Sequence, residues 1–245
     1  MVFQVVNHGI PPSILEELEA GVRGFFEKKT EVKKEFYMRD PIRPVRYNSN
    51  FYLFTSPAAN WRDAIFCSMA PNPPMPEDLP VVCRDILMKY SKQVEKLAIL
   101  LLELLSEALG LNSNYLKDTG RAKGHAFLCH CSPPCPEREL TLATSKQADS
   151  CFLTVLLQDH IGGPQVLHED RWIDGHPIPG ALVVNIGDLL QLVSNDRFKS
   201  FEHRVLANHK EESTPKYWET TIKDFVACYN SKGLDGTSVL LQFTL

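Results

Sequence analysis

Two apolar runs, Cys151–Gln158 (CFLTVLLQ) and Ile178–Gly187 (IPGALVVNIG), dominate the stretch from Leu140 to Asn208. Each run is short, rich in Val, Leu and Ile, and followed by Gly or Asp, which is typical of buried strands. Asp149 stands just before the first run and His203 follows the second. Carboxylate and imidazole are both common metal ligands. The stretch therefore predicts two strands with a candidate metal pair beside them.

Short strand signals continue on both sides of these two runs. The segment Glu169-Asp170 is predicted to turn a hairpin between Gln165–His168 and Arg171–Ile173. Further strands are expected at His125–Cys131, Thr141–Ser145 and Phe201–Ala207. Several short strands at regular spacing, separated by turn residues, favour a sandwich or a jelly roll.

The first half of the chain has helical periodicity instead. Ser13 followed by Glu16 has the pattern of a capping box, and the helix that it opens is expected to run to about Phe26. Cys83–Leu109 has a broad apolar stripe at helical spacing, and Gly110 stands where a C′ glycine ends a helix. We interpret these segments as helices that pack on the sheets.

Composition excludes several classes of function. The chain has 245 residues, a net charge of −4 and no stripe of Lys and Arg, so nucleic-acid binding is not expected. The most apolar run, Leu97–Leu105, contains Glu103 and is too short to cross a bilayer, so no membrane role is expected. The seven scattered cysteines, with no secretion signal, predict free thiols and a cytoplasmic location.

Longer stretches resemble a known family. They are FQVVNHGIP at residues 3–11, FLTVLLQDHIGG at 152–163, PIPGALVVNIG at 177–187, FKSFEHRV at 198–205 and KGLDG at 232–236. These residues are similar to the iron(II)/2-oxoglutarate-dependent dioxygenases of plant specialised metabolism. The similarity is greatest to the subgroup of 1-aminocyclopropane-1-carboxylate oxidase homologues and deacetoxyvindoline 4-hydroxylase.

This resemblance implies a mainly β fold with flanking helices, a double-stranded β-helix or jelly roll that is expected to be incomplete. It also implies three regions: a helical and strand region at 1–110, the jelly-roll core at 120–210, and a C-terminal helix and strand at 215–245. Segments of the family pattern are expected to be missing before residue 3 and between about His209 and Thr214.

The resemblance further implies an Fe(II) site with 2-oxoglutarate as co-substrate and ascorbate as a further cofactor. Asp149 and His203 match the carboxylate and the distal histidine of the family's two-His-one-carboxylate ligand set. No catalytic side chain is expected beyond these metal ligands. In the family the positions of Asn185, Leu192 and Phe198 line or support the pocket, and in this chain the three residues are equally consistent with core positions.

Three positions depart from the family pattern. The first ligand position holds Gln147 where the family has His, and an amide oxygen is a poorer Fe(II) ligand than an imidazole nitrogen. Ser132 occupies the place of a tyrosine that helps to bind the co-substrate. The Arg-x-Ser motif that binds the far carboxylate of 2-oxoglutarate is absent after His203.

Other side chains offer alternative metal sites. His160 and His168 could replace the missing ligand, although the subgroup fills these positions with polar turn residues. Cys129, Cys131 and Cys135, with His125 or His130, could bind zinc, although their spacing differs from the usual C-x₂-C pairs.

Two hypotheses of function follow. The first is an oxidoreductase that uses O₂ and 2-oxoglutarate to oxidise a small organic molecule, with the chain as a monomer. The second is a catalytically inactive relative with a binding role or no function, as Gln147 and the absent Arg-x-Ser suggest.

Overall fold

The strands form three antiparallel sheets in the computed structural model, which describes residues 1–40, 42–49, 59–121 and 123–208. The first sheet has the order β1-β9-β6, made by Val2–Val5, Leu182–Ile186 and Leu153–Leu157. The second has the order β5-β10-β7-β8, made by Leu142–Gln147, His203–Leu206, Pro164–His168 and Arg171–Asp174. The third has the order β2-β3-β4, made by Val45–Ser49, Asp63–Ala70 and His125–Cys131.

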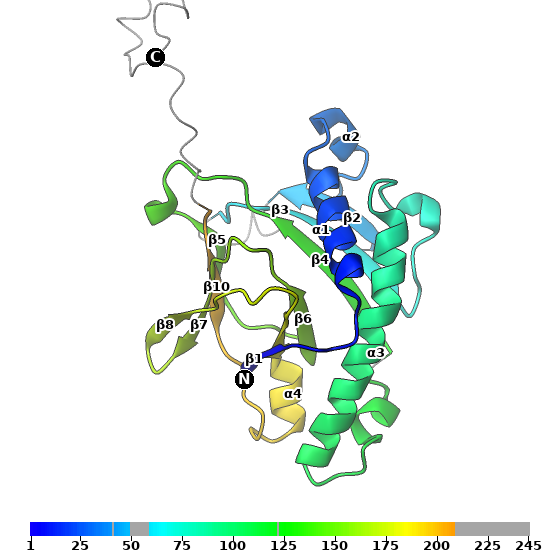
Figure 1. The fold of residues 1–245 in the computed structure, drawn as a ribbon, viewed down its shortest axis with the longest axis vertical. Helices are drawn as coiled ribbons and strands as arrows, with labels where there is room; N and C mark the ends of the chain where they lie inside the picture. Colours follow the sequence, from blue (N-terminus) through cyan, green and yellow to red (C-terminus); the bar gives the residue numbers. More distant parts are fainter. Residues whose placement is uncertain (41, 50–58, 122, 209–245) are drawn as a thin grey trace, which may run out of the picture. The chain divides into compact units, whose positions relative to one another are not determined.

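Two long helices, α1 (Pro12–Phe26) and α3 (Arg84–Ala108), lie together on one side of these sheets (Figure 1). The β7–β8 hairpin lies on the other side. Shorter helical segments complete the described chain: α2 (Thr30–Lys34), α4 (Asp188–Val193), η1 (Pro76–Asp78), η2 (Lys117–Arg121) and η3 (Arg138–Leu140). The prediction of a mainly β fold with flanking helices is confirmed.

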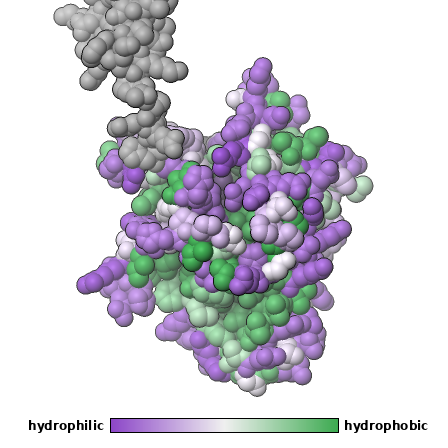
Figure 2. All heavy atoms as spheres, viewed as in Figure 1, coloured by the Kyte–Doolittle hydropathy of each residue, from purple (hydrophilic) through white to green (hydrophobic). Residues whose placement is uncertain are grey.

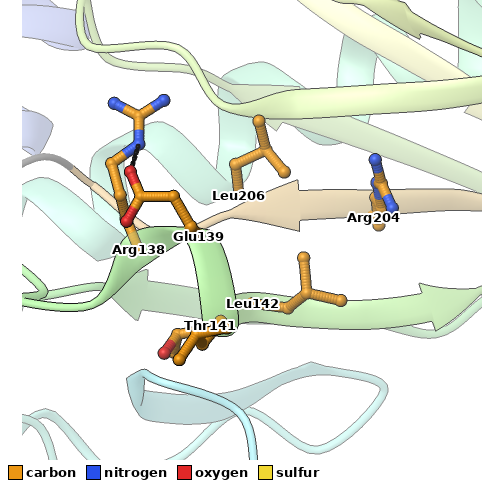
Figure 3. A pocket seen from close by; sticks show the side chains of 7 residues that line it. Arg138, Glu139, Thr141, Leu142, Arg204 and Leu206 are labelled. Atoms are coloured by element: carbon orange, nitrogen blue, oxygen red, sulfur yellow. Dashed lines mark ion pairs between the residues drawn. The ribbon is translucent and has the colours of Figure 1, made fainter.

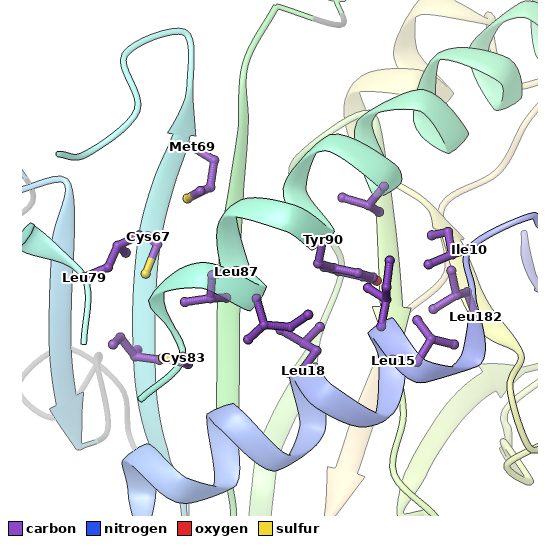
Figure 4. Packing of buried hydrophobic residues seen from close by; sticks show 14 of the residues in the cluster. Ile10, Leu15, Leu18, Cys67, Met69, Leu79, Cys83, Leu87, Tyr90 and Leu182 are labelled. Carbon is purple, nitrogen blue, oxygen red and sulfur yellow. The ribbon is translucent and has the colours of Figure 1, made fainter. Parts of the chain in front are cut away.

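The main core lies between the two long helices and one face of the sheets (Figure 4). Leu15 and Leu18 from α1 and Leu87 from α3 pack there with Leu182 and other residues of β9. Side chains alternate along a strand, so Val183 and Asn185 of β9 point to the opposite face. On that opposite face, Asn185 donates a hydrogen bond to Asp149, which follows the β5 strand of the second sheet.

Most local predictions hold. The hairpin turns at Glu169 and Asp170, whose φ angles of 47° and 60° fit the left-handed conformation of a two-residue hairpin loop. The α3 helix ends at Ala108, and Gly110 has a φ of 75°, as a C′ glycine requires.

The capping-box prediction at Ser13 is wrong. The α1 helix begins at Pro12 with Pro11 as its N-cap, and no side chain caps it. Proline suits the first helical position because its φ angle is already helical and it lacks the N–H that would be left unpaired there. Ser13 therefore lies inside the helix.

The predicted division into regions 1–110 and 120–210 stays a prediction. Residues Met1–Asn208 cluster as one unit. The region 215–245 and the segment between His209 and Thr214 lie outside the described residues. Within those described, no helix combines the length and hydropathy that a bilayer crossing requires.

The surface carries hydrophilic and hydrophobic residues side by side (Figure 2). On the face shown, hydrophobic residues gather over the lower part, where α3 and α4 lie. Exposed leucines of these two helices are Leu100, Leu104, Leu189 and Leu192.

Candidate metal centre

The structure brings Asp149 and His203 together. His203 begins β10 and Asp149 follows β5, and Nε2 of His203 lies 3.5 Å from Oδ1 of Asp149. Each side chain is only 16% exposed. Two ligands that each bind one metal ion at about 2.1 Å and at right angles are about 3 Å apart. The spacing of the two donor atoms therefore suits a shared cation.

Asp149 is held by two further contacts. Nδ2 of Asn185 donates a hydrogen bond to Oδ2 of Asp149 over 3.1 Å, which leaves Oδ1 facing His203. The backbone N–H of Asp188 donates to the carbonyl of Asp149 over 2.7 Å. Gly187 is required beside this turn, because a Cβ there would lie 2.9 Å from the carbonyl oxygen of Asp149 and closer still to that of Cys151.

Gln147 lies directly opposite His203 in the antiparallel pair of β5 and β10. Residues paired in this way point to the same face of a sheet. Gln147 is exposed, and its amide can offer only a neutral oxygen. The part of the chain that the structure describes holds no group of three His, Cys, Asp or Glu side chains arranged for a metal ion. The described residues thus offer a metal two strong donors, Asp149 and His203, and Gln147 on the same sheet face could add at most a weak amide donor.

Of the three residues expected around the pocket, only Asn185 contacts a candidate ligand in this geometry. Leu192 is 73% exposed and lines an outer hollow with Asp188. Phe198 packs instead against the small core that includes Ile186 and Leu190. The specific contact of Asn185 with Asp149 was not apparent in the sequence, because the two residues are 36 positions apart.

Ser132 follows β4, where its carbonyl oxygen accepts a hydrogen bond from Nδ2 of Asn208 over 2.9 Å. The next residue, Pro133, accepts one from Nε1 of Trp61, also over 2.9 Å. These contacts fix the chain at the end of β4. A role for the Ser132 hydroxyl in co-substrate binding stays a prediction.

The cysteines and histidines considered as alternative metal ligands have other contacts in the structure. Cys129 and Cys131 pack on the main core, and burial raises the pKa of the Cys129 thiol to about 12, which disfavours the thiolate that zinc needs. His125 lies 2.7 Å from the hydroxyl of Ser91. His168 lies at the hairpin beside Glu169, at 3.9 Å.

A groove of about 460 Å³ lies on the outside of β5 and β10 (Figure 3). Arg138 and Glu139, whose charged groups are 3.8 Å apart, stand at its rim, and Arg204 contributes to its wall. The Arg204 guanidinium stacks 4.1 Å from the ring centre of Trp172. Since Arg204 follows His203 on β10, it points away from the candidate metal centre.

Two family models match the chain. Residues 123–221 match the 2OG-Fe(II) oxygenase superfamily, and residues 2–85 match the N-terminal region described as "non-haem dioxygenase in morphine synthesis N-terminal". The first match includes Gln147, Asp149 and His203.

Curated relatives cover nearly the whole chain. 1-aminocyclopropane-1-carboxylate oxidase homolog 1 of Arabidopsis thaliana is 53% identical over 272 residues, which cover 99% of this chain and 74% of the relative. Homolog 3 from the same plant is 52% identical over 273 residues, with the same coverage of both chains. The first alignment spans 272 positions, whereas this chain has 245 residues, so at least 27 aligned positions have no counterpart here.

Solved structures share the fold. The crystal structure of JOX2 in complex with 2OG, Fe and JA has a TM-score of 0.79 and 27% identity, covering 100% of this chain and 82% of JOX2. The dioxygenase for auxin oxidation 1 from Arabidopsis thaliana, in its binary complex with 2-oxoglutarate, has a TM-score of 0.69 and 24% identity, covering 85% and 78%. Such oxygenases have a jelly-roll fold and depend on Fe(II) and 2-oxoglutarate, as the sequence predicted. This chain belongs to the 2OG-Fe(II) oxygenase superfamily, alongside the 1-aminocyclopropane-1-carboxylate oxidase homologues.

Proposed function

We propose that the chain binds Fe(II) through Asp149 and His203 and acts as a 2-oxoglutarate-dependent oxidoreductase on a small organic substrate. The observation that carries this proposal is the 3.5 Å approach of His203 Nε2 to Asp149 Oδ1, with both side chains largely buried. When bound, Fe(II) and 2-oxoglutarate supply the activation of O₂. The JOX2 structure, which holds JA beside 2OG and Fe, supports a small-molecule substrate.

Each side chain has a distinct task in this proposal. His203 supplies a neutral nitrogen donor, and Asp149 supplies a charged oxygen that Asn185 keeps turned toward it. Gln147 stands at the third position with a neutral amide oxygen. Loss of a partner that merely orients a ligand costs roughly 10- to 100-fold in metal affinity. Replacing an imidazole ligand costs at least as much, so turnover is expected to be low.

The glutamine at position 147 also favours a second function, that of an inactive relative. With no third His, Cys, Asp or Glu beside the pair in the described residues, the chain can be a catalytically inactive relative that keeps a binding role. Under this alternative, the chain binds small organic molecules without consuming 2-oxoglutarate.

Three further properties belong to the proposal. A monomeric state, a cytoplasmic location and the use of ascorbate as a reductant follow from the resemblance and from the composition of the chain. Size-exclusion chromatography with light scattering checks the first of these directly.

Metal binding and turnover test the proposed function separately. Mn(II) binding is measured by the loss of the free-ion paramagnetic resonance signal, and succinate formation is measured with Fe(II), 2-oxoglutarate and O₂. We expect binding that disappears in both Asp149→Ala and His203→Ala, and weak succinate formation that disappears with them. Mn(II) binding that survives both substitutions overturns the assignment of the metal centre. Metal binding without succinate formation favours the inactive relative.

A further inference from the structure

The groove on the outside of β5 and β10 has an apolar floor. Leu142 of β5 pairs with Leu206 of β10, and both half-buried side chains line the groove. Figure 3 shows them on the same side of the two strands as Arg204. Leu140, just before β5, adds a third leucine that is 84% exposed. Covering such leucines with an apolar group is favourable, so the floor suits a ligand with an apolar body.

The guanidinium of Arg204 is held in a fixed orientation at the wall of this groove. Its Nε donates a hydrogen bond to Oε1 of Gln165 over 2.7 Å, and its plane stacks 4.1 Å from the ring centre of Trp172. Gln165 is held in turn, because its Nε2 donates to Oδ1 of Asp174 over 2.7 Å. An arginine that is stacked and hydrogen-bonded in this way loses little further side-chain freedom when a ligand binds.

The two terminal amino groups of Arg204 still have hydrogen bonds to give. A guanidinium has five N–H donors, and Gln165 accepts only the one on Nε. Stacking on an aromatic ring uses the face of the guanidinium plane and leaves its edge open. Within the described part of the chain, Nη1 and Nη2 of Arg204 make no hydrogen bond and no carboxylate lies within 4 Å of them. The groove therefore contains an oriented cation that can pair with an anion.

The charge of the groove lining also favours an anion. Its seven residues include two arginines and one glutamate, so the lining is net positive in a chain whose net charge is −4. The glutamate, Glu139, lies 3.8 Å from Arg138, and both side chains are more than a third exposed, so that their ion pair is weak. The other lining residues are three leucines and Thr141. The complementary ligand is one negative charge joined to an apolar body.

The size of the groove and the engagement of β5 favour a small molecule over a peptide. The volume of about 460 Å³ lies within the range of small-molecule sites, which is roughly 300–1,000 Å³. A peptide that added a strand to β5 would need its backbone groups. Two of these are already bonded, because the carbonyl of Leu142 accepts from the N–H of Trp61 and the N–H of Ser145 donates to the Asn60 side chain.

We propose that this groove is a second ligand site, which binds a small organic monocarboxylate. The carboxylate pairs with Nη1 and Nη2 of Arg204, and the apolar body covers Leu140, Leu142 and Leu206. The site is separate from the candidate metal centre, because Arg204 and His203 are neighbours on β10 and point to opposite faces of the sheet. Binding at the groove therefore requires neither iron nor 2-oxoglutarate.

Three probes test the two parts of this site. Cyclohexanecarboxylate has both the charge and the apolar body, cyclohexanecarboxamide has only the body, and acetate has only the charge. Their dissociation constants are measured by saturation-transfer nuclear magnetic resonance on the full chain, with EDTA present so that no metal ion is bound. We expect cyclohexanecarboxylate to bind roughly 10- to 100-fold more tightly than the amide, since a charge-assisted pair forms, and more tightly than acetate. In Arg204→Gln the acid is expected to bind no better than the amide, whose own affinity is unchanged.

Two further variants serve as a second test and a control. Leu140→Asn changes a highly exposed side chain, so the fold is kept, and the acid and the amide are both expected to bind roughly 3- to 10-fold more weakly. Arg171→Gln removes an exposed arginine of β8 that does not line the groove. Its affinity for all three probes is expected to equal that of the unmodified chain.

Equal affinity of the unmodified chain for the acid and the amide, or no binding of the acid, overturns the proposed site. So does an equal loss of both probes in Arg204→Gln, which indicates that the stacked arginine only supports the sheet. Asp149→Ala and His203→Ala are expected to bind the acid as the unmodified chain does, whether or not the metal centre binds a metal. Weaker binding of the acid in these two variants would instead locate it at the metal centre and overturn the assignment to the groove.

Discussion

His203 and Gln147 lie directly opposite each other across β5 and β10, on the sheet face where His203 also meets Asp149. The strand register therefore puts the residue expected at the third ligand position on the same sheet face as His203, where its amide would be a weak donor. The scaffold and the ligand chemistry can thus be tested independently.

Gln147→His is expected to tighten metal binding by at least roughly 10-fold, because an imidazole nitrogen replaces an amide oxygen on the same face as His203. The change in the Mn(II) dissociation constant checks this prediction. Lys146→His is the control, since Lys146 precedes Gln147 on β5 and its side chain pairs with Glu202 on the other face. Equal tightening in both variants would show that the new histidine acts without the proposed geometry.

Asn185→Leu is expected to weaken Mn(II) binding by roughly 10-fold, because Asp149 loses the hydrogen bond that orients its carboxylate. Thr154→Val is a matched control. Thr154 lies opposite Asn185 on β6, and the substitution replaces its hydroxyl by a methyl group of similar size. Metal affinity should be unchanged in the control. An unchanged affinity in Asn185→Leu would show that Asp149 is oriented by its backbone alone.

Gly187→Ala is expected to abolish metal binding and to lower the free energy of unfolding by about 1–3 kcal/mol, because its Cβ would force apart the backbone at Asp149 and Cys151. Metal titration and urea unfolding check the two effects. In Gly110→Ala the added Cβ would have no neighbour within 4 Å. Only the positive φ of 75° at this position disfavours the alanine. It is expected to lose about 1 kcal/mol without a change in metal affinity.

Leu87→Ala is expected to lower the free energy of unfolding by about 2–5 kcal/mol, because Leu87 is fully buried between α3 and the sheets. Leu104→Ala makes the same change on the same helix, where the side chain is 52% exposed, and is expected to lose less than about 1 kcal/mol. Urea unfolding measures both. Similar losses at the two positions would contradict the described packing of α3.

Much of the fold could be predicted from the sequence because its signals are local. The apolar runs that became β6 and β9, the helical stripe of α3 and the turn at Glu169-Asp170 each reflect the backbone preference and burial of neighbouring residues. The start of α1 was predicted wrongly at Ser13. Two local signals overlap there, the capping pattern at Ser13 and the proline at position 12, and the helix begins at the proline.

By itself the sequence determined which residue types are available: Asp149, His203 and a glutamine where the family has a histidine. Only the tertiary structure decided which distant side chains meet. Asn185 contacts Asp149 across 36 positions, and Arg62 contacts Thr144 across 82. Such contacts depend on strand register and on the packing of one sheet against another, and a one-residue shift in register would turn each side chain to the other face. Periodicity along the chain carries no information about that choice.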